Sequence, residues 1–232
     1  MIVLEAVDLA KVYQGGDGCE ITVLDGISLQ VGRGDMTAIV GASGAGKSTL
    51  LHLLGALDRP TRGSVRIAGE TTADRDDDEL SALRNRTVGF VFQFHHLLRE
   101  FTAVENVMMP LRIAGWAPRR ARERAVELLN RVGLGARLGH KPSALSGGEQ
   151  QRTAVARALA PDPAVLLADE PSGNLDHANS ERLHDLFAEL SRDLEIAMVI
   201  ATHNRSLASR ADRTLLLVDG RLVETDVREA VP

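Results

Sequence analysis

Residues 41–48 have the sequence GASGAGKS, which matches the pattern G-x-x-x-x-G-K followed by Ser or Thr. Glycines in such a loop let backbone N–H groups turn toward phosphate oxygens, and a helix that begins at its end adds partial positive charge. Lys47 can then reach the outer phosphates, and the Ser48 hydroxyl can ligate Mg²⁺. The residues that we expect to contact the phosphates or the nucleotide here are Gly41, Ser43, Gly44, Gly46, Lys47, Ser48 and Thr49.

The flanks of this loop fit a phosphate site. Residues 36–40 form a short apolar run suited to a buried strand, and residues 47–54 have the composition of a helix. The alternative is a glycine-rich turn that binds nothing, and such a turn requires neither flank. We therefore predict a strand, a phosphate-binding loop and a helix in direct succession.

Two acids end another predicted strand. Residues 164–170, AVLLADE, are apolar up to Asp169 and Glu170. Acids placed there by chance are merely solvated, but after a phosphate loop the first carboxylate fits a ligand of Mg²⁺ and the second fits a general base that polarises water. Residues 196–201 predict a further strand that brings His203 to the same edge, although a histidine at a strand end is by itself more often structural.

Gln93 follows the predicted buried strand 88–92. A glutamine that leaves a central strand toward the ligand-bearing edge can contact Mg²⁺ or the attacking water, but one glutamine is weak support. The residues expected to act in catalysis are Lys47, Gln93, Glu170 and His203. The residues expected to hold Mg²⁺ are Ser48, Gln93 and Asp169.

Residues 145–152 have the sequence LSGGEQQR, in which a serine and two glycines precede a run with good helix propensity. Ser146 fits the N-cap, and Glu149 fits the position that completes a capping box. One interpretation is only a helix start. The other is a second anion site made by Ser146, Gly147 and Gly148, because bare N–H groups at a helix N-terminus attract phosphate.

The composition limits the classes of function. The 232 residues suffice for one large α/β domain with an inserted piece. The formal net charge is −5, and charges of both signs are spread throughout, so we expect no nucleic-acid partner.

Cys19 is the only cysteine, which excludes an internal disulfide and suits a reducing cytosol. The longest apolar runs, such as residues 196–201, are far too short to span a bilayer, so we expect that the chain itself does not cross a membrane.

The N-terminal part of the chain predicts an antiparallel edge sheet. Residues 2–8 and 23–31 both alternate apolar and polar side chains. Tyr13 lies between them, is the only tyrosine of the chain and precedes the phosphate loop. It can stack on a nucleotide base, or it can be an aromatic residue that packs inside a small sheet.

From His95 to about Pro161 the pattern becomes helical. The clearest helix covers 119–132, where one stripe is apolar and charges cover the rest. The apolar members of that stripe are Ala121, Ala125, Leu128, Leu129 and Val132. We interpret this region as an inserted helical subdomain.

The motifs occur in the order and approximate spacing of ATP-binding cassette (ABC) ATPases, which the sequence resembles over nearly its whole length. The pairing of a phosphate loop with LSGG-x-Q is far more specific than either motif alone. The resemblance implies an α/β fold with the P-loop NTPase core of an ABC ATPase, an antiparallel β edge subdomain and an inserted α-helical subdomain. It implies one ABC ATPase domain over 1–232. In that domain, residues 1–93 and 162–232 form a RecA-like core with the β subdomain, and residues 94–161 form the helical subdomain that carries the signature motif.

The same resemblance implies ATP hydrolysis with Mg²⁺ and gives each matched position a role. These roles are adenine stacking for Tyr13, a lid glutamine for Gln93, the signature for Ser146, Gly147 and Gly148, a magnesium ligand for Asp169, the general base for Glu170, a dimer-loop aspartate for Asp176 and the switch histidine for His203.

Within the family, the run FHHLL at 94–98 resembles the lipoprotein-releasing branch. That branch implies a homodimer of ATPase subunits, integral membrane transporter subunits as partners and a peripheral location on the cytoplasmic face of the inner membrane. The macrolide-export and cell-division branches share the other motifs and stay open as alternatives. Two positions depart from the family pattern, because Ser172 stands where threonine is usual and Asn204 stands where an acid is usual.

Two other classes of enzyme also use such loops. Soluble ABC mechanoenzymes that act on DNA or ribosomes usually carry a long coiled-coil insertion or tandem cassettes, and this sequence has neither. A small-molecule kinase with a phosphate loop leaves LSGGEQQR unexplained.

Overall fold

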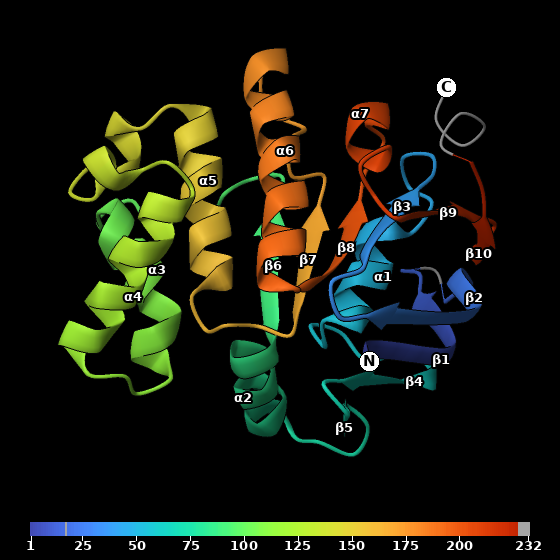
Figure 1. Cartoon of the computed structure of the whole chain (residues 1–232). Coiled ribbons are helices and arrows are strands. Elements are labelled where there is room, and N and C mark those ends of the chain that lie inside the picture. Colours follow the sequence, from blue (N-terminus) through green and yellow to red (C-terminus); the bar gives the residue numbers. More distant parts are fainter. Residues whose placement is uncertain (17, 227–232) are drawn as a thin grey trace.

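A six-stranded sheet forms the centre of the fold. The computed structural model describes residues 1–16 and 18–226 (Figure 1). The strand order is β10-β9-β3-β8-β7-β6, and all neighbours are parallel except the β9-β10 hairpin. The strands of this sheet are β3 (Met36–Val40), β6 (Val88–Phe92), β7 (Val165–Asp169), β8 (Ala197–Ala201), β9 (Arg213–Val218) and β10 (Arg221–Glu224).

A four-stranded antiparallel sheet lies beside it, in the order β2-β1-β4-β5. Its strands are β1 (Ile2–Gln14), β2 (Glu20–Gly32), β4 (Arg62–Ile67) and β5 (Glu70–Thr71). The predicted antiparallel edge sheet is therefore present, but β1 and β2 are longer than residues 2–8 and 23–31. The strands continue past these limits because β-bulges absorb the breaks in alternation, with register shifts such as the one between Ala6 and Leu9.

Three helices gather beyond the β6 edge of the parallel sheet, at the left of Figure 1. They are α3 (Ala103–Ile113), α4 (Pro118–Arg131) and α5 (Gly147–Leu159). The predicted apolar stripe of α4 is buried along its whole length. Helices do not fill the entire range from His95 to Pro161, because segments before Thr102 and between Val132 and Ser146 form loops and 3-10 turns. The boundaries 94–161 remain our proposal for the helical subdomain.

The remaining α-helices pack on the faces of the parallel sheet or, in one case, lead directly into its edge strand. They are α1 (Lys47–Leu54), α2 (Asp77–Thr87), α6 (His177–Leu194) and α7 (Arg205–Ala208). Strand β8 shows how the core divides, since Met198 and Ile200 pack with α5 and α6, whereas Val199 packs with α1 and the antiparallel sheet. Burial on both faces explains why the parallel strands are apolar without alternation. Over residues 1–16 and 18–226, no helix is long and apolar enough to span a membrane.

Gly89 lets α5 approach the parallel sheet closely. A Cβ atom at Gly89 would lie 2.6 Å from the carbonyl oxygen of Ala158 and 2.9 Å from Cδ1 of Leu166. The first of these is backbone of α5 and cannot move independently of the helix. The small residue in β6 therefore sets the distance between the helical region and the strand that leads to Gln93.

We expect Gly89→Ala to lower the free energy of unfolding by about 1–3 kcal/mol, because it forces an extra carbon into a closed contact. The matched control is Gly139→Ala, at a position where an added Cβ has no neighbour within 4 Å. Urea titration of both variants measures the difference. Equal midpoints for the two variants would contradict this account of the contact.

Candidate active site

Most of the predicted catalytic and phosphate-binding residues converge at the carboxyl edge of the parallel sheet. Strand β3 leads into the phosphate loop, β6 into Gln93, β7 into Asp169 and Glu170, and β8 toward His203. A cavity of about 410 Å³ opens at this edge. Its lining residues are Val23, Ser43, Gly44, Gly46, Lys47, Ser48, Thr49, Gln93, Asp169 and Glu170. The structure thus brings the predicted magnesium residues and all of the predicted phosphate-loop residues except Gly41 into one cavity.

The phosphate loop requires its glycines for two physical reasons. Gly41, Gly44 and Gly46 have φ values of 152°, 80° and 101°, which residues with a side chain rarely adopt. In addition, a Cβ atom at Gly41 would lie 2.5 Å from the Leu217 carbonyl oxygen, and one at Gly46 would lie 2.9 Å from Cγ1 of Val23. The loop is therefore wrapped closely between β9 and β2.

Lys47 is almost fully buried, with 8% of its surface exposed. Its ammonium group donates hydrogen bonds to the carbonyl oxygens of Gly41 and Ala42, at 2.8 and 3.1 Å. The same nitrogen lies 3.9 Å from Oε1 of Glu170. These contacts hold the Lys47 ammonium group against the backbone of the loop, on the side that faces Glu170.

Glu170 and His203 are in direct contact. The His203 ring nitrogen Nδ1 lies 2.8 Å from Oε1 of Glu170, and the His203 backbone N–H donates to Oε2 at 3.3 Å. Glu170 has φ 44°, in the left-handed region, and its backbone N–H donates to the Ala201 carbonyl oxygen at 2.9 Å. Two residues that lie far apart in the sequence are thereby held together, and one of them, Glu170, lines the cavity.

Gln93 contacts a residue that the sequence analysis gave no role. Its Nε2 donates to Oδ1 of Asn174 at 3.2 Å, and Asn174 Nδ2 donates back to the Gln93 carbonyl oxygen at 3.2 Å. Gln93 and the segment that follows Glu170 are therefore linked. The only sequence signal for this contact is the position of Asn174 within the run SGNLD, and a polar residue in a turn is by itself not informative.

Tyr13 lies on β1, close to the start of α1. Its hydroxyl donates to Oδ2 of Asp58 at 3.0 Å and also interacts with Thr49, while Nζ of Lys11 lies 4.9 Å from the ring centroid. Partial burial and the neighbouring Asp58 carboxylate raise the pKa of Tyr13. The side chain is 39% exposed, so it is not an aromatic enclosed within the small sheet. Its stacking role remains a prediction.

Ser146 caps α5 as predicted. Its hydroxyl accepts from the Glu149 N–H at 3.3 Å, and the Glu149 carboxylate accepts from the Ser146 N–H at 2.8 Å. Arg137 pairs with Glu149 at 3.0 Å. Among the described residues that line the phosphate cavity, however, none belongs to 145–152. Within one chain, the two predicted anion-binding elements are therefore not parts of the same site.

Comparison with known proteins agrees with this geometry. The family model for ABC transporters matches residues 24–173. The chain belongs to the ABC transporter family. It is 56% identical over 220 residues to the lipoprotein-releasing system ATP-binding protein LolD of Alcanivorax borkumensis, with 95% of this chain and 96% of that protein covered. It is also 56% identical to LolD of Geobacter metallireducens, with 95% and 97% covered.

Solved ABC cassettes share the fold. A dimeric, post-hydrolysis structure of the ATP-binding cassette MJ0796 bound to ADP and Pi matches with a TM-score of 0.87 and 38% identity, and the match covers 97% of this chain and 99% of that chain. A second dimeric structure of MJ0796 gives the same TM-score. The predicted fold class, a P-loop core of ABC type with an antiparallel sheet and added helices, is confirmed.

Proposed function

We propose that this chain is the ATP-hydrolysing subunit of an ABC transporter that releases lipoproteins from the inner membrane. The observation that carries the proposal is the cavity in which Lys47 and Glu170 face each other across the phosphate loop. The chemistry of this site is ATP hydrolysis. Support for the substrate comes from relatives named as LolD of the lipoprotein-releasing system, which align with 95% of the chain.

ATP is the substrate, and its phosphates fit the glycine loop. Backbone N–H groups and Lys47 meet the negative charge there. Ser48, Gln93 and Asp169 line the same cavity and offer a hydroxyl, an amide carbonyl and a carboxylate, which are the hard oxygen donors that Mg²⁺ prefers. Bound at these residues, Mg²⁺ would supply a Lewis acid that neutralises charge on the phosphate oxygens.

Glu170 is the proposed general base. Its carboxylate orients water and accepts a proton as that water attacks the terminal phosphate. The contacts with the side chain and the backbone N–H of His203 hold the carboxylate in one direction, toward the cavity. Lys47 serves a different step, because it stabilises the phosphates in the ground state as well as during reaction.

We expect Glu170→Gln to bind ATP normally but to turn over about 10²- to 10⁴-fold more slowly, because the amide cannot accept the proton. Lys47→Ala should instead weaken ATP binding, since the buried ammonium is lost. Nucleotide titration and steady-state ATPase assays separate the two effects. Near-normal turnover by Glu170→Gln would remove this residue from the role of base.

The active unit that we propose is a homodimer in which each ATP lies between the loop of one subunit and the LSGG segment of the other. One loop surrounds only part of a triphosphate, so the terminal phosphate can meet a second helix N-terminus. The N-terminus of α5 is capped and lies outside the phosphate cavity of its own chain. The dimeric state of the MJ0796 cassettes supports this arrangement.

The segment after Gln93 is the proposed docking surface for a membrane subunit, and we define this surface as Phe94, Leu98 and Phe101. These side chains are 64%, 43% and 38% exposed. Leu97 lies in the same segment but is only 8% exposed, so it belongs to the core and not to this surface. The buried Asn106 accepts from the Leu98 N–H at 2.8 Å and donates to the Leu98 and Phe101 carbonyl oxygens, which fixes the backbone from which the Leu98 and Phe101 side chains point outward.

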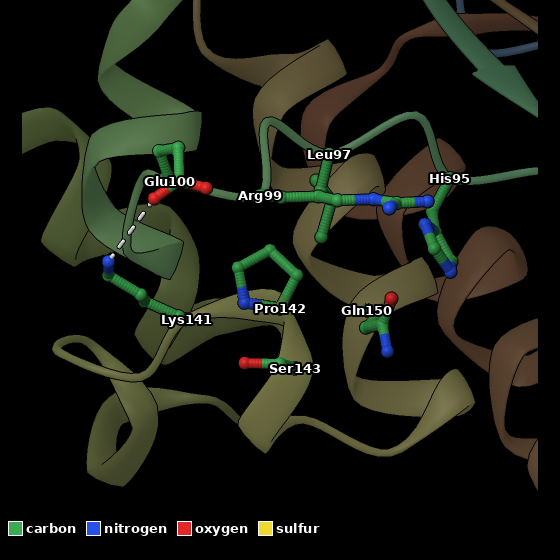
Figure 2. Close-up of a pocket in the computed structure, with 8 residues that line it drawn as sticks. All are labelled: His95, Leu97, Arg99, Glu100, Lys141, Pro142, Ser143 and Gln150. Carbon is green, nitrogen blue, oxygen red and sulfur yellow. Dashed lines mark ion pairs between the residues drawn. The ribbon is translucent and has the colours of Figure 1, made fainter.

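A pocket of about 550 Å³ adjoins this surface (Figure 2). Its walls come from the segment after Gln93, from the turns that precede α5 and from the start of α5 itself. Its lining residues are His95, Leu97, Arg99, Glu100, Lys141, Pro142, Ser143 and Gln150. Lys141 and Glu100 form an ion pair across it at 3.7 Å. A cytoplasmic helix with an apolar face and polar flanks fits an apolar surface beside a charged pocket, and it would place the chain peripherally on the cytoplasmic face of the inner membrane.

We expect the double substitution Leu98→Ser and Phe101→Ser to abolish co-purification with the membrane subunits while basal ATPase activity stays near wild type. Both side chains are exposed, so little core packing is lost. The matched control is Val223→Ser, at an exposed apolar residue of β10 at the far edge of the sheet. If the double variant unfolds, or if it binds the membrane subunits as well as the control does, the docking assignment is wrong.

A further inference from the structure

Helix α6 carries a fully buried histidine, His184, which takes no part in the chemistry described above. Its exposed surface is 0%, and its Nε2 lies 2.9 Å from the hydroxyl oxygen of Ser172. Its Nδ1 lies 3.4 Å from Oε1 of Glu181 but has no hydrogen-bond partner within the described part of the chain. A buried polar nitrogen without a bond is costly, so this placement calls for an explanation.

The surroundings indicate the protonation state of this ring. Burial lowers the pKa of His184, although the Glu181 carboxylate opposes that effect. The imidazole is therefore neutral near pH 7 and carries one proton. A carboxylate can only accept, so the proton belongs on Nδ1, which faces Glu181, and Nε2 accepts the hydrogen bond from the Ser172 hydroxyl.

Ser172 lies within the turn that begins at Glu170. That turn contains a left-handed residue, Glu170, at φ 44°, and such a conformation persists only when its neighbours hold it in place. On the upstream side, the Glu170 N–H is fixed to Ala201 of β8 at 2.9 Å. Downstream, the Gly173 N–H closes the turn on the Glu170 carbonyl oxygen at 3.0 Å, and Ser172 is anchored to His184.

On its other side, His184 faces a carboxylate that is bound to the segment after His203. Glu181 accepts from the Ser206 hydroxyl at 2.7 Å and pairs with Arg210 at 2.8 Å. These two bonds lower the pKa of Glu181 to about 2, so it stays ionised at any physiological pH. Ser206 lies on α7, which begins two residues after His203.

We propose that His184 is a positioning residue for ATP hydrolysis, which joins the turn of Glu170 through Ser172 to the His203 segment through Glu181. This proposal rests on the proposed role of Glu170 as the base. The ring fixes the position of Glu170 relative to His203, because its Nε2 is hydrogen-bonded to Ser172 and its Nδ1 lies 3.4 Å from the Glu181 carboxylate that holds Ser206.

The test uses His184→Leu and Ser172→Ala in the full-length chain. We expect each to lower kcat about 3- to 20-fold, as the loss of one buried hydrogen bond allows, with the KM for ATP changed by less than about twofold. The double variant should be no slower than the worse single variant, because both remove the same contact. Ser172→Thr, which keeps the hydroxyl, should retain kcat.

The decisive comparison places His184→Leu in a Glu170→Gln background. If His184 acts through Glu170, its substitution should cause no further loss of single-turnover rate once the carboxylate is gone. General damage to the fold would instead lower the rate both with and without the carboxylate. The matched control is Ser191→Ala, which removes a buried hydroxyl of α6 that is bonded to the Gly34 and Ile196 carbonyl oxygens and makes no bond to the turn. It should lower the melting temperature and leave kcat unchanged.

Normal kcat in both His184→Leu and Ser172→Ala would overturn the proposal, as would an equal loss of rate with and without Glu170. If His184→Leu does not fold, Ser172→Ala and Ser172→Thr still decide the question. The proposed function fails separately, since that failure is seen as near-normal turnover by Glu170→Gln alone.

Discussion

The site depends on the way in which the chain turns at Glu170. The turn leaves β7 in the left-handed region and is fixed to β8 by the bond from the Glu170 N–H to the Ala201 carbonyl oxygen. This one constraint directs the carboxylate toward Lys47 and into contact with His203. Without it the acid would end a strand and face solvent, and the phosphate loop would lack the carboxylate that we propose as the general base.

The parallel sheet supplies the rigidity that this turn needs. Strands β3, β8, β7 and β6 are adjacent and parallel, so their carboxyl ends bring four separate loops to one edge. Both faces of the sheet are buried, by α5 and α6 on one side and by α1 with the antiparallel sheet on the other. A close-packed support of this kind fixes loop positions to within the tolerance that a hydrolytic site requires.

Local sequence patterns predicted the helices, strands and loops, whereas the contacts between separate elements could not be predicted from them. The phosphate loop, the acids that end β7 and the cap at Ser146 could be predicted because each depends on a few consecutive residues with a specific backbone requirement. The pairs Gln93 with Asn174, Tyr13 with Asp58 and His184 with Ser172 could not, because each joins separate elements whose packing no local pattern encodes. The lengths of β1 and β2 were underestimated for a related reason, since bulges break the alternation without ending the strand.

The central claim is that one chain builds only part of the hydrolytic site and that a second copy completes it with Ser146. The direct measurement is the ATPase activity of a mixture of Lys47→Ala and Ser146→Arg subunits, compared with each variant alone. If the site is shared, the mixed dimer places both lesions at one site and leaves the other intact, so activity returns. If each chain works alone, every site carries a lesion and the mixture stays inactive. Full activity of a wild-type monomer, at concentrations far below those at which it dimerises, would contradict the account.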